Sequence, residues 1–231
     1  MVLSYPKSID REKIKAYAPL IISAFIITLA AIVFKQNFVR TLPLYVSLFV
    51  GMLQARASRF SYLVGGLNCV LYTVVYISLG LYASAASALL FSCPIQLITF
   101  VSWSKHSYKH STEFKSLSTF KWLLIGIVFS VGFVIVNFVL SATYSSYRFL
   151  DNSASILGLI VSLLSMLSYR EYSWLMLVTG SLNIVLYLNM SFDNPAQITF
   201  LIYGMYSMFC IIRQFFSVQK LYTEQKNAEE I

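Results

Sequence analysis

Charged residues are scarce in this chain. Only 11% of its 231 residues are Asp, Glu, Lys or Arg, whereas 58% are hydrophobic and 16% are aromatic. A soluble domain cannot bury so much apolar surface, and the mean hydropathy of +0.72 is typical of membrane proteins. The polar segments are short and cover residues 1–16, 104–120 and the last dozen, so no room remains for a separate soluble domain.

Several chemical features are also missing. The three cysteines, Cys69, Cys93 and Cys210, all lie in apolar runs, which argues against a disulfide framework. His106 and His110 have no third metal ligand nearby, so a solvated loop is the better interpretation. There is no Gly-rich phosphate loop and no nucleophile with a base and an orienting group. The sequence therefore predicts neither an enzyme nor a cofactor or metal site.

Apolar windows of about 17–22 residues predict an all-α membrane protein with eight transmembrane helices. The predicted spans are 17–35, 42–56, 60–79, 81–103, 121–143, 153–169, 172–190 and 196–215. Gly80 and the segment 191–195 supply the breaks where long spans nearly touch. The first run follows a basic segment but is longer than a signal-peptide core, so we interpret it as a signal-anchor helix.

The basic residues are distributed unevenly about these spans. With eight spans, fourteen of the 17 Lys and Arg residues fall on the side of the N-terminus, and only Lys35, Arg40 and Arg148 fall on the other. Because cytoplasmic loops of membrane proteins are enriched in Lys and Arg, both termini are predicted to be cytoplasmic. The same distribution explains the net charge of +8 without nucleic acid as a partner.

An internal repeat organises the chain. Gly65-Gly66-Leu67-Asn68-Cys69-Val70-Leu71-Tyr72 returns as Gly180-Ser181-Leu182-Asn183-Ile184-Val185-Leu186-Tyr187, an offset of 115 residues. Each copy has a shorter apolar run before it and a longer one after it, which indicates a duplicated three-helix unit. The predicted units are parallel and related by an axis along the membrane normal, an arrangement that transporters use to build a site between halves.

The repeat divides the chain into five segments. Residues 1–41 would hold the cytoplasmic N-terminus and an extra first helix, 42–103 the first three-helix repeat, and 104–152 a basic cytoplasmic loop and a linker helix. Residues 153–215 would form the second three-helix repeat, and 216–231 a cytoplasmic tail.

Polar side chains inside the spans are the candidate site. Asn68 and Asn183 occupy equivalent positions in the two units, and Tyr72 and Tyr187 follow one helical turn later on the same face. Intramembrane amides can simply bond neighbouring helices, and tyrosines often only pack. Their paired placement favours a shared central site, where amides hydrogen-bond a ligand and rings stack on it.

Ionisable residues are absent from the deep parts of the spans, since Asp151, Glu171 and Asp193 all lie at predicted ends. Proton relays and many ion-coupled sites need such a group within the membrane. The absence favours transport of a neutral or weakly charged molecule down its gradient. Sodium sites made of backbone carbonyls, and hence an ion-coupled transporter, stay open.

The sequence resembles the PnuC family of vitamin transporters over about residues 42–215. The resemblance rests on Gly80-Leu81-Tyr82-Ala83 through Pro94-Ile95-Gln96 to Trp103, and on Tyr169-Arg170-Glu171-Tyr172-Ser173-Trp174 leading into Leu182-Asn183 and Tyr187. It implies a three-plus-one-plus-three helix arrangement similar to SWEET sugar transporters. It also implies that Gln96 and Trp103 belong to a fourth-span motif and that Trp174 and Asn183 belong to a seventh-span motif.

The resemblance further implies a function and a cell compartment. It implies facilitated diffusion of a nucleoside-like vitamin, typically nicotinamide riboside, through a bacterial inner membrane, with a cytoplasmic kinase trapping the product. The expected binding residues are Asn68, Tyr72, Gln96, Trp103, Trp174, Asn183 and Tyr187. Phosphorylated ligands are expected to fail, because no basic residue lies deep in a span. Family members can oligomerise, so a homo-oligomer also stays open.

One position departs from the family pattern. Members that take nicotinamide riboside often have a Trp-x-x-Trp pair near Trp174, but the second position here is Leu177. A missing stacking partner alters a pocket wall, so thiamine or a deoxynucleoside stays an alternative substrate. The alternative from another class is a membrane scaffold whose Asn residues only lock helices together, which would bind no small molecule.

Overall fold

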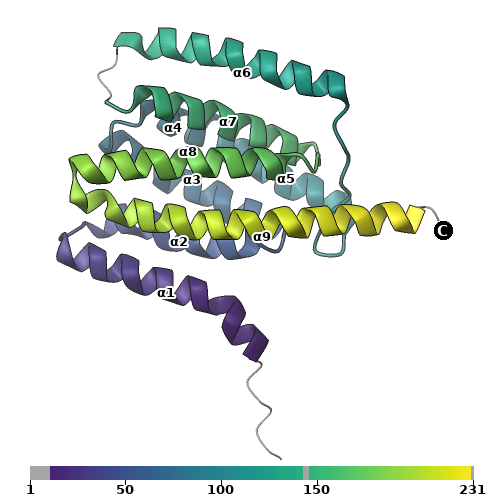
Figure 1. The fold of residues 1–231 in the computed structure, drawn as a ribbon, viewed down its shortest axis with the longest axis horizontal. Coiled ribbons are helices and arrows are strands. Elements are labelled where there is room, and N and C mark those ends of the chain that lie inside the picture. Colours follow the sequence, from purple (N-terminus) through teal and green to yellow (C-terminus); the bar gives the residue numbers. More distant parts are fainter. Residues whose placement is uncertain (1–10, 143–145, 230–231) are drawn as a thin grey trace, which may run out of the picture.

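The computed structural model describes residues 11–142 and 146–229, so the predicted N-terminal tail lies largely outside the described part. The described chain is almost entirely helical (Figure 1). Its α-helices are α1 (Arg11–Val33), α2 (Phe38–Gln54), α3 (Phe60–Ser78), α4 (Tyr82–Ala86), α5 (Cys93–Lys105), α6 (Thr119–Val139), α7 (Arg148–Met166), α8 (Tyr172–Asp193) and α9 (Ile198–Glu229). Two short strands, β1 (Ser107–Tyr108) and β2 (Ser111–Thr112), pair in an antiparallel hairpin between α5 and α6.

A π-helical segment, η1 (Ser87–Ser92), joins α4 and α5 into one rod. Pro94 lies two residues after its end and has no backbone N–H to donate, and its ring crowds the carbonyl group four residues earlier. This interrupts the α-helical hydrogen-bond pattern just before Pro94, where π-bulges are tolerated. Two short 3₁₀ segments, η2 (Leu140–Ala142) and η3 (Pro195–Gln197), flank the ends of α6 and α9.

Six helices of the described chain are long and apolar enough to cross a membrane. They are Phe60–Ser78, Tyr82–Lys105, Thr119–Val139, Arg148–Met166, Tyr172–Asp193 and the helix within Pro195–Ala228. Tyr17–Val33 and Phe38–Gln54 are also apolar but shorter. The chain is therefore a multi-pass membrane protein, as its composition predicts.

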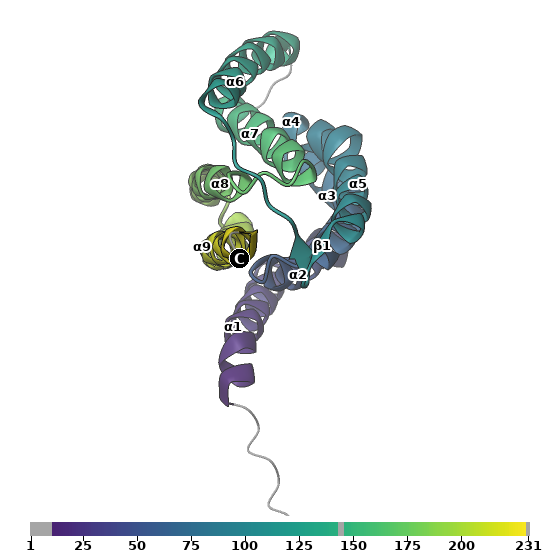
Figure 2. The ribbon, with the colours of Figure 1, turned by 90° about the vertical axis from the view of Figure 1, so that its right-hand side faces the viewer.

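Six rods close into a ring. In order, α2 packs on α3, α3 on α5, α5 on α7, α7 on α8, α8 on α9, and α9 returns to α2. Figure 2, which views the bundle nearly end-on, shows α1 outside this ring beside α2 and α9, and α6 outside it beside α7. α6 buries none of its residues, so it contributes to the periphery rather than to the core.

Several helices extend beyond the predicted spans, among them α7 at its start and α9 at its end. The sixth span was expected to begin at residue 153, but α7 begins at Arg148, because Asp151 and Asn152 are buried among neighbouring helices instead of facing solvent. The last span was expected to end at 215, but α9 continues to Glu229 (Figure 1). Its polar extension is held by the Gln225 side chain, which donates to the Thr112 carbonyl oxygen at 2.9 Å and accepts from the Phe114 N–H at 2.9 Å.

Candidate functional site

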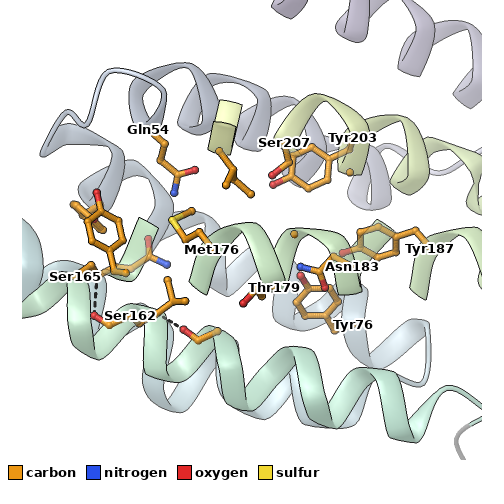
Figure 3. A pocket seen from close by; sticks show the side chains of 18 residues that line it. Gln54, Tyr76, Ser162, Ser165, Met176, Thr179, Asn183, Tyr187, Tyr203 and Ser207 are labelled. Atoms are coloured by element: carbon orange, nitrogen blue, oxygen red, sulfur yellow. Dashed lines mark hydrogen bonds between the residues drawn. The ribbon is translucent and has the colours of Figure 1, made fainter. Parts of the chain in front are cut away.

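The six-helix ring surrounds a cavity of about 230 Å³ (Figure 3). Every helix of the ring contributes side chains, whereas α1 and α6 contribute none. The lining residues are Gln54, Tyr62, Tyr76, Gln96, Gly158, Val161, Ser162, Ser165, Tyr172, Met176, Thr179, Gly180, Asn183, Tyr187, Tyr203, Gly204, Ser207 and Ile211. None of these carries a charge, so the polar side-chain groups that the cavity offers are hydroxyls and amides, beside aromatic and aliphatic side chains.

A second lobe of about 220 Å³ adjoins this cavity and shares Tyr76, Gln96, Gly158, Thr179 and Asn183 with it. It extends towards the π-helical segment, where serine side chains line it. The two lobes together reach the size of sites that enclose small organic molecules, about 300–1,000 Å³. Walls that combine apolar surface with amides and hydroxyls are found in such sites, and both lobes have walls of this kind.

Asn183 presents an unused amide to the cavity. Its side chain lies between Tyr76 and Tyr187 in Figure 3 and lines both lobes. Within the described residues it makes no side-chain hydrogen bond. An intramembrane amide needs a partner, so Asn183 is available to a ligand or to water.

Asn68 has a different environment, although it is the repeat counterpart of Asn183. It is buried, and its Nδ2 donates to the Pro43 carbonyl oxygen at 3.1 Å and to Ser47 Oγ at 2.8 Å, which ties α3 to α2. Ser47 in turn donates to the Tyr72 hydroxyl at 3.0 Å. Asn68 therefore lies behind the cavity wall and does not line it.

The same offset of 115 residues relates the partners of Asn68 to residues near Asn183. Pro43 corresponds to Gly158 and Ser47 to Ser162. Ser162 Oγ donates to the Gly158 carbonyl oxygen of its own helix at 2.8 Å, and both residues line the cavity. In the first predicted unit, the Asn68 amide bonds the preceding helix. In the second, Ser162 bonds its own helix instead, and the Asn183 amide has no side-chain hydrogen bond within the described residues.

The predicted tyrosines are layered. Tyr187 lines the main cavity and packs on Phe200, with ring centroids 5.8 Å apart. Tyr72 lies behind Tyr76 and stacks on it at 5.2 Å with an interplanar angle of 27°. Tyr72 reaches only the second lobe, so it supports the ring of Tyr76 more than it lines the site.

Gln96 lines both lobes, and its Nε2 donates to Cys69 Sγ at 3.4 Å. Its amide oxygen lies directly over Gly65, at a place that a Cβ atom at residue 65 would fill. The glycine of the repeated segment therefore lets Gln96 lie against α3.

Both predicted tryptophans lie away from the cavity. Trp103 is fully buried, donates from Nε1 to the Ser165 carbonyl oxygen at 2.8 Å, and packs edge-on against Tyr62 at 4.7 Å. Trp174 is 54% exposed on the outside of α8 and packs on Phe215 at 4.6 Å. Leu177, where the family pattern has a second Trp, does not line either lobe.

Sequence reasoning missed several lining residues. On α8 they share a face with Asn183, because Thr179 lies four residues before it and Met176 seven before it. This spacing from Asn183 marks both residues in the sequence as members of the same helix face. No such signal marked Gln54, Tyr62, Tyr203 or Ser207, which reach the cavity only through the closure of the ring.

Comparison with known proteins gives three matches. The family model described as nicotinamide mononucleotide transporter matches residues 37–217. A curated relative from Neisseria mucosa, the nicotinamide riboside transporter PnuC, is 29% identical over 140 residues, which cover 58% of this chain and 53% of the relative, so the match spans about half of its length. The crystal structure of the vitamin B3 transporter PnuC superposes with a TM-score of 0.78 over 95% of each chain at 20% identity, a likeness of fold.

Proposed function

The chain belongs to the nicotinamide mononucleotide transporter family, and we propose that it carries a nucleoside-like vitamin, with nicotinamide riboside as the first candidate, by facilitated diffusion. It is a transporter rather than an enzyme in this proposal. The observation that carries it is the uncharged cavity inside the ring, into which the Asn183 amide projects without a partner among the described residues. Since no lysine or arginine lines that cavity, an unphosphorylated riboside fits it better than a mononucleotide.

In this proposal Asn183 and Gln96 hydrogen-bond the ribose hydroxyls or the amide edge of the ligand, and Tyr76 and Tyr187 supply ring faces. Asn68 and Tyr72 hold the wall from behind. Trp103 would act through Tyr62 and Tyr172, which it contacts and which line the cavity. A direct contact of Trp174 with the ligand would require another conformation of the carrier.

The proposed mechanism is alternating access by rocking of two parallel three-helix repeats, residues 42–103 and 153–215, with α6 as linker and α1 as an extra helix. All eight rods would span the bacterial inner membrane, with both termini and the hairpin in the cytoplasm. A cytoplasmic kinase would trap the ligand, since a phosphorylated product finds no basic residue in the cavity.

Two alternatives to this proposal make different demands on the cavity. Thiamine or a deoxynucleoside would suit the same uncharged walls, and the replacement at Leu177 changes no residue that lines the cavity. The scaffold alternative requires that both repeat asparagines lock helices. Asn68 does so, but Asn183 bonds no neighbouring helix, which favours a ligand site.

The first experiment is uptake by the purified protein in proteoliposomes. Labelled nicotinamide riboside, a pyridinium cation, is expected to equilibrate across the membrane when the membrane potential is held at zero. Its uptake under that condition should be unchanged when sodium and proton gradients are imposed or removed. Labelled nicotinamide mononucleotide should not enter. Uptake driven by either gradient would contradict facilitated diffusion, and the absence of uptake of the riboside, thiamine and deoxynucleosides alike would contradict transport of this ligand class.

Replacing Gly65 by alanine is expected to raise the KM for uptake about fivefold. The new Cβ would displace the Gln96 amide from its place over α3, and a lost hydrogen bond of about 1 kcal/mol corresponds to roughly that factor. The matched control is Gly126→Ala on α6, where a Cβ would meet no atom within 4 Å. A KM that is unchanged in Gly65→Ala would show that Gln96 does not contact the ligand.

A further inference from the structure

A separate cavity of about 530 Å³ lies at the end of the ring that carries the hairpin. The end of α2, the turn of the hairpin and the extension of α9 line it. The lining residues are Leu53, Arg56, Ser58, Lys109, His110, Ser217, Lys220, Leu221 and Glu224. None of these lines the central cavity. The two cavities also differ in charge, because three cations and one carboxylate line this one, whereas the central cavity has an uncharged wall.

Among the described residues, the carboxylate forms a close ion pair with one of the three cations. Lys109 Nζ lies 2.6 Å from Glu224 Oε2, and this hydrogen bond raises the pKa of Lys109, so the pair is charged at neutral pH. Arg56 and Lys220 have no carboxylate oxygen within 4 Å among the described residues. With three cations and one carboxylate, the cavity keeps a net positive charge, carried by Arg56 after α2 and by the lysines of the hairpin and α9.

The walls of this cavity are fixed by hydrogen bonds. His110 Nε2 donates to the Arg56 carbonyl oxygen at 2.7 Å, and the Arg59 N–H donates to the His110 carbonyl oxygen at 3.3 Å. On the other side, Ser217 Oγ donates to the Ala55 carbonyl oxygen at 2.9 Å, which ties α9 to the end of α2. The cationic side chains thus project from three backbone segments that are already joined.

Membrane topology alone does not account for this arrangement. The bias of basic residues to the cytoplasmic side requires only that they lie on that side of the membrane. It does not require them to converge on one hydrogen-bonded cavity. A guanidinium group and an ammonium group facing one space are instead typical of sites for phosphate oxygens, which accept charge-assisted hydrogen bonds from both.

We propose that this basic cavity binds a phosphate group, carried by a phosphorylated small molecule or by an anionic lipid headgroup, between Arg56 and Lys220. Arg56 follows α2 of the first repeat, whereas Lys220 lies on α9, which continues from the second repeat. A phosphate held by both would bridge the two halves and stabilise one conformation of the carrier. Gln54, two residues before Arg56, lines the central cavity, so the bridge lies close to the ligand path.

The effect on uptake rests on the proposed function, whereas the binding itself does not. If the carrier rocks between conformations, a phosphorylated product that accumulates in the cytoplasm would slow further uptake of its precursor. This is feedback by the product class that a kinase would make.

Binding is tested on the purified full-length protein in detergent at low ionic strength, with nicotinamide mononucleotide and inorganic phosphate as probes. At least one probe is expected to raise the melting temperature, with an apparent affinity that falls as salt is added. Arg56→Gln/Lys220→Gln should weaken that affinity at least about tenfold. Lys220→Gln alone, at an exposed side chain, covers the case in which the double variant fails to fold.

Two controls locate the effect. Lys105→Gln removes an exposed lysine at the end of α5 that does not line this cavity, and it should leave phosphate binding unchanged. Asn183→Leu should also leave phosphate binding unchanged, but it should impair the binding and uptake of nicotinamide riboside. Failure of the central site and failure of the basic cavity are therefore distinguishable. Nicotinamide mononucleotide enclosed in proteoliposomes should slow riboside uptake by the wild type but not by Arg56→Gln/Lys220→Gln.

A further measurement in lipid distinguishes a phosphorylated small molecule from an anionic lipid headgroup. The protein is placed in nanodiscs of phosphatidylcholine with or without phosphatidylglycerol. Stabilisation by phosphatidylglycerol but not by the soluble probes, lost in Arg56→Gln/Lys220→Gln, would assign the site to a lipid headgroup. If no phosphate-bearing probe or lipid stabilises the wild type, or if the variants respond as the wild type does, the proposal is overturned.

Discussion

Replacing Asn183 by leucine is expected to lower kcat/KM for uptake about 100-fold while leaving the melting temperature of the unliganded protein nearly unchanged. The amide makes no hydrogen bond within the described protein, so its removal costs the fold little. The ligand, in contrast, would lose two hydrogen bonds and keep unpaired polar groups in an uncharged cavity, about 3 kcal/mol in all. Uptake in proteoliposomes and thermal unfolding in detergent measure the two effects on the same preparation.

Two substitutions test whether the effect belongs to the cavity. Asn189→Leu replaces an exposed asparagine on the same helix, and both uptake and stability should stay close to wild type. Asn68→Leu should show the opposite pattern to Asn183→Leu. It removes the bonds to Pro43 and Ser47, so a melting temperature lower by about 5 °C is expected. If Asn183→Leu loses stability but transports normally, Asn183 locks helices together and does not contact the ligand.

The contrast between Asn68 and Asn183 also shows how far sequence reasoning could go. The offset of 115 residues places both asparagines on the second helix of a predicted unit, α3 and α8, and both helices belong to the ring. Sequence identity of the two segments could not reveal which amide is free. That depends on the partners, since Ser47 bonds Asn68 and Tyr72, whereas Ser162 bonds Gly158 of its own helix.

The tryptophans show a second reason why the predicted site and the observed cavity differ. An indole near a predicted membrane edge is equally compatible with a pocket wall, an interfacial anchor and a core position. Trp103 is a core residue because the hairpin and the start of α8 fold over it, bringing Phe114 and Tyr172 against its ring at 5.6 Å and 6.2 Å. Those contacts join segments far apart in the sequence, and no local pattern reports them.

Asp151 is buried, although its position near a predicted span end did not indicate this. As a polar residue near a predicted span end, it was expected to lie in the linker segment, outside the second repeat. In the structure it is 2% exposed in the first turn of α7. Its carboxylate accepts from the backbone N–H groups of Ala83 and Ser84, at 3.1 and 3.3 Å, and from the Ser84 hydroxyl. It therefore caps the N-terminus of the α4–α5 rod from a helix of the other unit, where an anion is favoured by the helix dipole.

Asp151→Ala is accordingly expected to lower the melting temperature of the unliganded protein by about 10 °C. Three donors lose a charged acceptor in a place that water does not reach freely, which corresponds to about 3–5 kcal/mol. The control is Asp193→Ala at the end of α8, where a change of about 2 °C or less is expected. Within the described part of the chain, its exposed carboxylate accepts a hydrogen bond from the Tyr147 hydroxyl alone, at 2.6 Å. Equal melting temperatures for Asp151→Ala and the wild type would show that the cap does not hold the two units together.

The position of Asp151 gives this cap a consequence beyond stability. The α4–α5 rod carries Gln96, and α7 carries Ser162, so the carboxylate joins the two walls that line the cavity from opposite units. It does so at the end of the ring opposite the hairpin, while the contacts of α9 with α2 and the hairpin join the units at the other end. A rocking motion must loosen one of these ends while the other holds. Asp151→Ala is therefore expected to change the rate of uptake at saturating ligand more than KM, because it alters the balance between conformations and leaves the lining of the main cavity in place.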